Sequence, residues 1–213
     1  FRYEARKSVT YEKIDLIITT GPPHSTHLMG LQLKSHFPEL KWIADLRDPW
    51  TNIYYNQFLR RTTRAQKKDQ RLESQVLEKA DLVTVVSPGM RDEFSDRAKA
   101  IEVVFNGYDE DDLTHLVEQP RDEFILSYVG NFKASQNIPA FWSALNKFIE
   151  EVPKGSFRFK LVGNRSEVID RQIQETIGLD AVIEKPFLPH DKAIAEMNDS
   201  SILFLPIPQQ GNN

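Results

Sequence analysis

The chain has 213 residues, of which 40% are apolar and 27% charged, and its formal net charge is −4. This composition is typical of a globular protein, and the length allows one large domain or two small ones. The acidic balance argues against nucleic-acid binding, because phosphate backbones require a basic protein face. The sequence has no cysteine, no apolar run long enough to cross a bilayer and no signal-peptide segment in FRYEARKSVTYEK, so we expect a cytoplasmic location.

The first half of the chain alternates short apolar runs with helical patterns. The runs are nearly continuous and rich in β-branched or aromatic residues, as in strands buried on both faces, and they span 15–19, 42–46, 82–86 and 101–105. Helical patterns lie between them at 25–36, 58–79 and 87–96. In the last of these, Ser87 is the expected N-cap and Pro88 the first helical residue. A βαβ series of this kind predicts a parallel sheet and an α/β fold.

A second βα series follows a connector. Residues 106–109 form a turn signal and the next segment is acidic, polar and proline-containing, so we place a domain boundary near Pro120, with domains 1–119 and 120–213. The second domain is expected to hold strands at 124–129, 157–162, 182–184 and 202–205, and helices at 139–151, 166–177 and 191–197. The last strand lacks a following crossover helix and little sequence precedes the first strand, so we expect both domains to be incomplete.

An ordered set of motifs runs through both halves. The motifs are TTGPPHSTHLMGL, WIADLRDPWT, LVTVVSPGM, FNGYDEDD, YVGNFKASQNIPAFWSAL, LVGN and FLPHDKAIAEMNDSSILFLP. From Ile14 onward the chain therefore resembles the bacterial family 4 glycosyltransferases. The resemblance implies the GT-B fold, in which two Rossmann-like domains face a cleft. It also implies transfer of a sugar from a UDP- or GDP-linked nucleotide-diphosphate sugar, with retention of configuration and without a bound metal or other cofactor.

The chain also departs from the pattern of this family. It ends before the loop and helix that carry paired glutamates in relatives, which predicts that this segment alone is inactive. Many relatives have a histidine at the reaction centre where this chain has Arg47. In the second half, many relatives carry an arginine where this chain has Asn131. They then carry a lysine where this chain has Gln136 or Asn137. Lys133 is the substitute cation that we expect to hold the diphosphate.

Sugar transfer requires a site that stabilises opposite charges. Breaking the bond between an anomeric carbon and a diphosphate builds positive charge on the sugar and negative charge on the leaving phosphate. A helix N-terminus favours a nearby anion by about 0.3–2 kcal/mol, and two loop–helix junctions in the second half supply such ends. Phe187 and Leu188 match the loop that cradles the base, with core packing as the alternative. On the resemblance, the donor-binding residues are Gly130, Asn131, Lys133, Gln136, Asn137, Gly163, Asn164, Arg165, Phe187 and Leu188.

The acceptor side is expected in the first half, where His24, Arg47 and Asp48 are the candidate catalytic residues. The resemblance places His24 at the cleft, able to hydrogen-bond an acceptor hydroxyl or a donor phosphate; a loop histidine with a backbone or solvent partner is the alternative. Arg47 can hold a phosphate or hydroxyl, but its permanent charge excludes proton transfer. Asp48 either orients Arg47 or takes the acceptor proton, or forms a purely structural pair with Arg47. The acceptor-side cleft residues are Gly21, Pro22, Ser25, Asp45 and Ser87.

A metal site is not expected in this chain. His24 and His27 are spaced i, i+3, which would suit two ligands on one helix face. No third ligand lies near them in the sequence.

Basic residues recur at helical spacing along the expected helix 58–79. They are Arg60, Arg64, either Lys67 or Lys68, and Arg71. Relatives often glycosylate lipid-linked or polysaccharide acceptors, and a basic helix gains about 1 kcal/mol per residue at an anionic lipid surface. A solvated helix face is the preferred interpretation of this pattern, and weak contact with the inner face of the membrane through helix 58–79 is the alternative.

The resemblance thus implies a retaining hexosyltransferase of polysaccharide or cell-envelope biosynthesis. It transfers a sugar from a nucleotide-diphosphate sugar to a glycan or lipid-linked hydroxyl, with the donor site mainly in 124–213. Attack occurs on the face from which the diphosphate departs, and the departing diphosphate assists deprotonation of the acceptor. The alternatives are a non-catalytic nucleotide- or glycan-binding module and a GT-B nucleotide-sugar epimerase.

Overall fold

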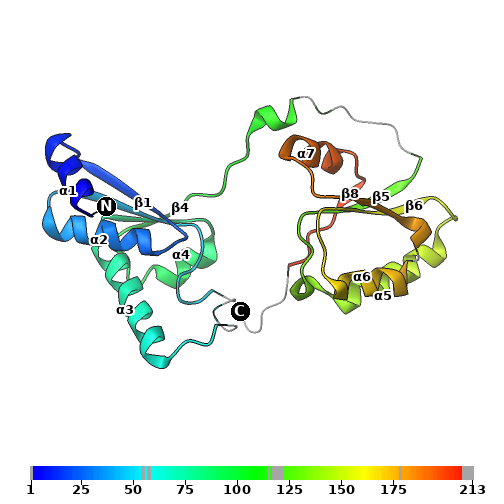
Figure 1. Cartoon of the computed structure of the whole chain (residues 1–213), viewed down its shortest axis with the longest axis horizontal. Coiled ribbons are helices and arrows are strands. Elements are labelled where there is room, and N and C mark those ends of the chain that lie inside the picture. Colours follow the sequence, from blue (N-terminus) through cyan, green and yellow to red (C-terminus); the bar gives the residue numbers. More distant parts are fainter. Residues whose placement is uncertain are drawn as a thin grey trace. The chain divides into compact units, whose positions relative to one another are not determined.

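The computed structural model describes residues 2–53, 56, 59–114, 116, 122–177 and 179–207 (Figure 1). The chain divides into two units, Phe1–Gly107 and Tyr108–Asn213. Each unit contains one parallel sheet of four strands, so the α/β class and the two-sheet organisation predicted from the sequence are confirmed.

Unit 1 has the strand order β1-β2-β3-β4, with every neighbouring pair parallel. The strands are β1 (Leu16–Gly21), β2 (Lys41–Leu46), β3 (Leu82–Val85) and β4 (Ile101–Val103). The helices are α1 (Arg2–Tyr11), α2 (Ser25–His36), α3 (Thr63–Lys79) and α4 (Pro88–Phe94). Helix α2 has the bounds that the sequence predicts, whereas α1 was not expected.

The core of unit 1 lies on one face of its sheet, under α2, α3 and α4. Its fully buried strand residues are Trp42, Ala44, Leu46, Val83 and Val85. On the opposite face, Leu16 is 47% and Ile18 is 63% exposed. The prediction that this strand is buried on both faces is therefore wrong for β1, because the helix that contacts it, α2, packs on the face that carries Ile17.

Unit 2 has the strand order β7-β6-β5-β8, again all parallel. The strands are β5 (Phe124–Val129), β6 (Phe157–Val162), β7 (Val182–Lys185) and β8 (Ile202–Leu203). The α-helices are α5 (Pro139–Glu151), α6 (Glu167–Thr176) and α7 (His190–Asn198), and the 3-10 helices are η2 (Glu110–Leu113), η3 (Ala134–Gln136) and η4 (Leu179–Ala181). Helices α5 and α6 lie on one side of the sheet and α7 on the other (Figure 1).

The two faces of the unit 2 sheet are packed differently. Under α5 and α6 the core is aromatic and apolar, and includes Tyr128, Phe132, Trp142, Phe159 and Ile169. Toward α7 the packing is polar, because the buried Lys160 of β6 donates to the backbone oxygen of Glu196 at 3.0 Å and bonds the Asp199 side chain at 3.1 Å. Lys185 forms a second ion pair with Glu196 at 2.6 Å.

Most of the predicted elements differ from the structure by one or two residues at an end, and the start of α3 differs by five. Helix α3 begins at Thr63 rather than at Phe58, because Thr62 Oγ1 accepts from the amide of Ala65 at 3.2 Å and caps it; Phe58 lies outside the described residues. Strands β4 and β8 are each two residues shorter than predicted. Among the described helices, none combines the length and apolar character needed to span a bilayer.

The division between the units falls before Tyr108, whereas the sequence predicts a boundary near Pro120. Residues after Gly107 belong to unit 2 because η2 packs against α7. Asp112 Oδ2 and His190 Nε2 lie 2.8 Å apart at this contact, and their hydrogen bond and charge raise the pKa of His190.

Candidate functional site

Asp45 occupies the middle of the carboxyl edge of the unit 1 sheet. The strand register places Thr20 on one side of it and Thr84 on the other. Both threonine hydroxyls donate to the carboxylate, each at 2.7 Å. Burial by itself raises the pKa of Asp45, but these two bonds and the charge of Arg47 outweigh burial and lower the pKa. Asp45 is therefore a hydrogen-bonded carboxylate at neutral pH.

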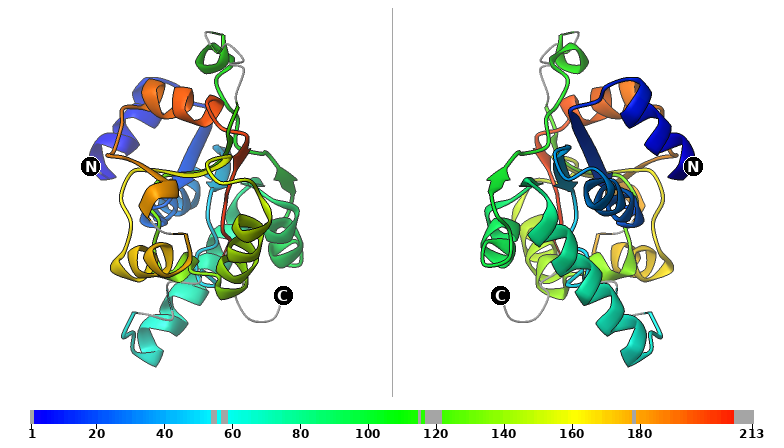
Figure 2. Two further views of the ribbon diagram at one scale, coloured as in Figure 1. Left: turned by 90° about the vertical axis from the view of Figure 1, so that its right-hand side faces the viewer. Right: turned by 90° about the vertical axis from the view of Figure 1, so that its left-hand side faces the viewer.

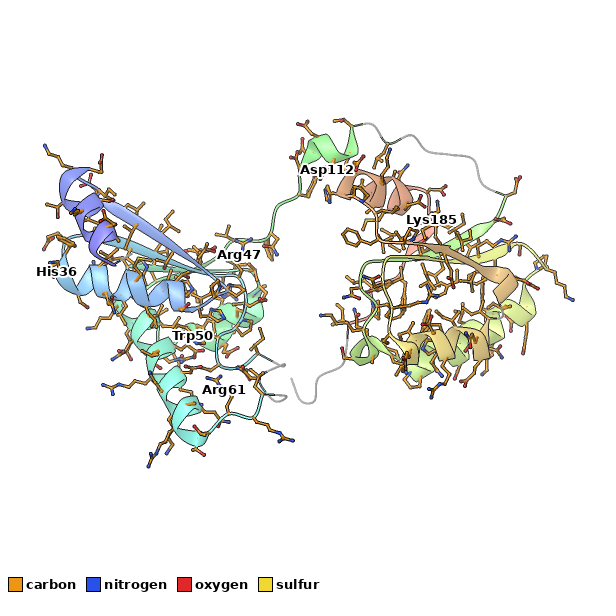
Figure 3. The ribbon with its side chains drawn as sticks, viewed as in Figure 1. His36, Arg47, Trp50, Arg61, Asp112 and Lys185 are labelled. Atoms are coloured by element: carbon orange, nitrogen blue, oxygen red, sulfur yellow. The ribbon has the colours of Figure 1, made fainter. Side chains whose placement is uncertain are left out.

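Arg47 follows β2 and is held at the same edge (Figure 3). Its backbone amide donates to the oxygen of Gly21 at 2.9 Å, and its guanidinium donates to the side-chain oxygen of Asn106. The nearest carboxylate is Asp45, at 3.6 Å. Among the described residues no ion pair joins Arg47 to Asp48, so neither a structural Arg47–Asp48 pair nor an orienting contact of Asp48 with Arg47 is present. Acceptance of the acceptor proton by Asp48 stays a prediction.

His24 immediately precedes α2, and its ring stacks on Trp50 with centroids 5.2 Å apart and an interplanar angle of 13°. Neither of its ring nitrogens meets hydrogen-bond geometry with a described residue. Burial lowers the pKa of His24, while the backbone of Pro49 and the charge of Asp48 oppose that shift. The imidazole is therefore neutral at neutral pH.

His27 lies one turn further along α2 and is completely buried. Its Nδ1 lies 2.9 Å from Thr19 Oγ1, which also accepts from Trp42 Nε1 at 2.9 Å. Burial, and secondarily the neighbouring His24, lower the pKa of His27 to about 4, against the opposing charge of Asp45. Within the described part of the chain, no group of three or more histidine, cysteine or acidic residues is placed to hold a metal ion.

The remaining acceptor-side candidates lie on the loops around these groups. Gly21 is buried, and a Cβ there would stand 2.7 Å from His27 Nε2, which explains the glycine. Pro22, whose preceding peptide bond is cis, and Ser25 are exposed. Ser87 caps α4 as predicted, because its Oγ accepts from the amide of Met90 at 3.3 Å.

At the carboxyl edge of unit 2, the loops after β5 and β6 lie directly against each other. Gly130 and Gly163 have φ angles of +143° and +106°, which favour glycine. A Cβ on Gly163 would come within 2.2 Å of the Gly130 oxygen. The amide of Phe132 donates to the oxygen of Asn164 at 2.8 Å and joins the loops. The backbone at this edge therefore lacks obstructing side chains at its two glycines.

Among the polar candidates that follow Gly130, two form hydrogen bonds within the fold and one is exposed. Gln136 Oε1 accepts from the amide of Lys133 at 2.9 Å, and its Nε2 donates to the oxygen of Pro206 at 3.3 Å. Asn137 Oδ1 accepts from the indole of Trp142 at 2.7 Å. These two side chains thus hold the loop together. Lys133 is exposed and has no ion pair with a described residue.

Of the remaining polar candidates in unit 2, Arg165 is engaged in ion pairs, whereas two asparagines are exposed. Arg165 pairs with Asp170 and, at 2.7 Å, with Glu184, so its charge is compensated within unit 2. The side chains of Asn131 and Asn164 are exposed.

Phe187 and Leu188 lie on the loop between β7 and α7. Phe187 is 78% exposed, whereas Leu188 is half-buried. Leu205, which follows β8 at the same edge, is 75% exposed. Core packing therefore does not explain Phe187.

Several residues at the two edges were not predicted. Thr20 and Thr84 hold Asp45, Asn106 holds Arg47, Trp50 stacks on His24, and Phe132 joins the unit 2 loops. The sequence did contain a signal for the two threonines. Each is a polar residue in a mainly apolar strand, near the carboxyl end, where parallel sheets bind their ligands.

Neither a protein-family model nor a curated protein matches the sequence significantly. Solved structures do match. Sucrose-phosphate synthase from Thermosynechococcus elongatus is 20% identical with a TM-score of 0.63, over 95% of this chain and 53% of that one. Anabaena Alr3699/HepE in complex with UDP is 15% identical with a TM-score of 0.61, over 91% and 53%. The lipopolysaccharide outer core galactosyltransferase WaaB, in its apo form, is 13% identical with a TM-score of 0.62, over 95% and 52%.

The chain spans about half the length of these structures. Identities this low establish the fold and leave activity to be argued from the residues. The two parallel sheets of four strands, matched across both units, show that the chain has the GT-B fold of these glycosyltransferases.

Proposed function

We propose that the chain is part of a glycosyltransferase that moves a hexose from a nucleotide-diphosphate sugar to a glycan or lipid-linked hydroxyl, with retention of configuration. The observation that carries this proposal is the glycine edge of unit 2, where Gly163 lets the loops after β5 and β6 abut and Gly130, with a φ of +143°, leaves its own backbone free of a side chain. HepE, which shares the fold, was solved with UDP, and a UDP-linked donor is accordingly our first choice.

In this proposal the donor residues have distinct roles. Lys133, which has no described ion-pair partner, supplies the positive charge for the diphosphate. The exposed ring of Phe187 packs against the base. Gln136 and Asn137 support the loop, and Arg165, already paired with two carboxylates, contributes less to phosphate binding.

The transfer step exchanges one bond for another at the anomeric carbon. The acceptor oxygen forms its bond to that carbon as the bond to the diphosphate oxygen breaks, and the bonding electrons leave with the phosphate. The acceptor proton passes to the departing phosphate oxygen. Arg47 is permanently charged and cannot accept this proton, and Asp48 is the alternative proton acceptor in this proposal. His24, neutral at neutral pH, and Arg47 orient the acceptor hydroxyl.

Calorimetric titration with UDP, UDP-glucose and GDP tests the donor site. We expect a uridine nucleotide to bind and Lys133→Ala to weaken binding about tenfold, because a charge-assisted bond to phosphate is lost. Lys154→Ala is the matched control, since Lys154 is an exposed lysine in the turn before β6. Absence of heat with all three nucleotides would refute the proposal. Binding without sugar transfer by the parent enzyme would instead indicate a non-catalytic module, and a changed donor sugar an epimerase.

A lipid-linked acceptor is supported by the basic stripe of α3 and the loop before it. Its residues, all exposed and none ion-paired with a described residue, are Arg60, Arg64, Lys67, Lys68 and Arg71. The first half of α3 extends beyond the other helices of its unit (Figure 2). We propose a cytoplasmic protein that rests weakly on anionic lipid through this stripe. Co-sedimentation with phosphatidylserine vesicles should decline at high salt, and lack of binding at low salt would exclude this contact.

A further inference from the structure

Two adjoining hollows of unit 1 lie between α2, α3 and the loop that follows β2. Their volumes are about 360 and 230 Å³. Asn56, Arg61 and Asp69 line both of them, so these three side chains stand at their shared boundary. The larger hollow reaches His24 and Trp50, which connects it to the carboxyl edge of the sheet. Its size lies in the range of small-molecule sites.

The boundary side chains are rich in hydrogen-bonding groups. Arg61 donates to Asp69, and their side chains are 23% and 27% exposed. This bond uses one of the five N–H donors of the guanidinium, and leaves acceptor positions on the carboxylate. Asn56 donates to the backbone oxygens of Trp50 and Thr51 at 3.2 and 2.9 Å, which fixes its amide in place. Trp50 and Arg61 lie on the same side of unit 1 (Figure 3).

The charge of the larger hollow is balanced. Arg61 and Asp69 cancel each other, and burial lowers the pKa of His24, so its imidazole adds no charge at neutral pH. A balanced site has little attraction for a phosphate or carboxylate, in contrast to the edge of unit 2 with its uncompensated Lys133. The apolar part of the wall comes from Leu28, Ile53 and Leu72.

An apolar wall beside a planar donor–acceptor pair matches the two chemical surfaces of an uncharged sugar ring, its C–H face and its hydroxyls. We propose that this hollow binds one neutral sugar residue, with Arg61 and Asp69 hydrogen-bonding its hydroxyls and Leu28 and Leu72 packing against its C–H face. That this sugar belongs to the acceptor rests on the proposed function. Binding itself requires only unit 1.

Saturation-transfer NMR with the methyl glycosides of glucose, galactose, mannose and N-acetylglucosamine tests this hollow, with glucuronate and inorganic phosphate as charged comparators. We expect at least one neutral glycoside to bind and neither comparator to compete with it. Asp69→Asn keeps the shape of the side chain, but removes a charged acceptor and leaves Arg61 uncompensated. This substitution should weaken glycoside binding at least about tenfold and create phosphate binding.

The matched control is Asp92→Asn, an exposed carboxylate of α4 that pairs with its neighbour Arg91 outside the hollow. Glycoside affinity should be unchanged in this variant, and circular dichroism should show both variants folded. No neutral glycoside binding to the unmodified chain, or equal loss in both variants, overturns the proposal. A UDP titration of the same samples separates the two sites: UDP binding without glycoside binding refutes only the hollow, and glycoside binding without UDP binding refutes only the donor site.

Discussion

The buried carboxylate of Glu73 holds the loop after β2 against α3. It is 2% exposed and accepts from the amide and hydroxyl of Thr51 at 2.8 and 2.9 Å, while Arg97 donates to its other oxygen at 2.9 Å. Removing one member of a buried pair leaves the others desolvated and unpartnered. Glu73→Ala should therefore lower the free energy of unfolding by about 3 kcal/mol, measured by urea denaturation.

The same helix supplies the control for this prediction. Glu78 is exposed, and Glu78→Ala should change the free energy of unfolding by less than about 0.5 kcal/mol. Equal effects of the two substitutions would show that the bonds of Glu73 add nothing to stability.

The low pKa of His27 makes the free energy of unfolding depend on pH. Its pKa is about 4 in the folded chain and 6.5 in the unfolded chain, so the unfolded chain takes up a proton first as the pH falls. Stability is therefore full above pH 6.5 and is lost progressively from there down to pH 4, by about 3 kcal/mol in total. His24 shifts in the same direction.

Urea midpoints between pH 7.5 and 4 measure this loss. His27→Asn cannot take up a proton in this range but keeps a side chain that can hydrogen-bond Thr19, so the variant should be less stable at neutral pH and show a shallower decline of stability in acid. An unchanged slope in the variant would assign the acid sensitivity to other groups.

At the residue scale, the sequence locates edge residues better than it locates their partners. Asp45 lies near the carboxyl end of an apolar strand and Arg47 follows that strand, and parallel sheets place their binding groups there. The threonine bonds to Asp45 depend on strand register, which no local pattern specifies. Likewise, spacing alone cannot show that Asn137 accepts from the Trp142 indole, because that bond depends on the fold of the loop.

Helix α7 is attached to its sheet through charged groups rather than through an apolar seam. Lys160 is 1% exposed and bonds the backbone oxygen of Glu196 and the side chain of Asp199. Lys160→Met should lower the free energy of unfolding by about 3 kcal/mol, because Asp199 loses a buried cation and the oxygens at the end of α7 lose their donor. Amide exchange across 190–198 should accelerate, as measured by mass spectrometry.

The exposed Lys192 on the same helix provides the comparison for Lys160. Lys192→Met should leave exchange across α7 within experimental error of the unmodified chain. Faster exchange in both variants would mean that net charge, and not the buried bonds, keeps α7 in place.

At the element scale, segments with a strong apolar pattern are predictable and their ends are less so. The bounds of α2, α5, β5 and β6 follow from the sequence alone. The start of α3 does not follow from the sequence, because the basic residues before Thr62 fit a helix equally well. The Thr62 cap determines where the helix begins. A continuous apolar run also failed to show that Leu16 and Ile18 of β1 are exposed, because a strand does not specify what covers it.

For the whole molecule, alternation of strands and helices was enough to predict two parallel sheets. The strand order in unit 2 was not predictable, because β8 pairs with β5, and that contact joins residues far apart in the chain. The residues after Gly107 belong to unit 2 through the contact of η2 with α7, which includes the pair Asp112–His190 and is equally long-range.

The described core residues of each unit form their own hydrophobic cluster, so we expect calorimetry to resolve two unfolding transitions. On the proposed function, UDP at a hundred times its dissociation constant should stabilise unit 2 by about 2.7 kcal/mol and leave the unit 1 transition where it is. Amide exchange assigns the transitions, through peptides of β2 for unit 1 and of β6 for unit 2. If UDP raises only the transition temperature of unit 1, the donor site lies instead at the sheet edge that carries Asp45 and Arg47.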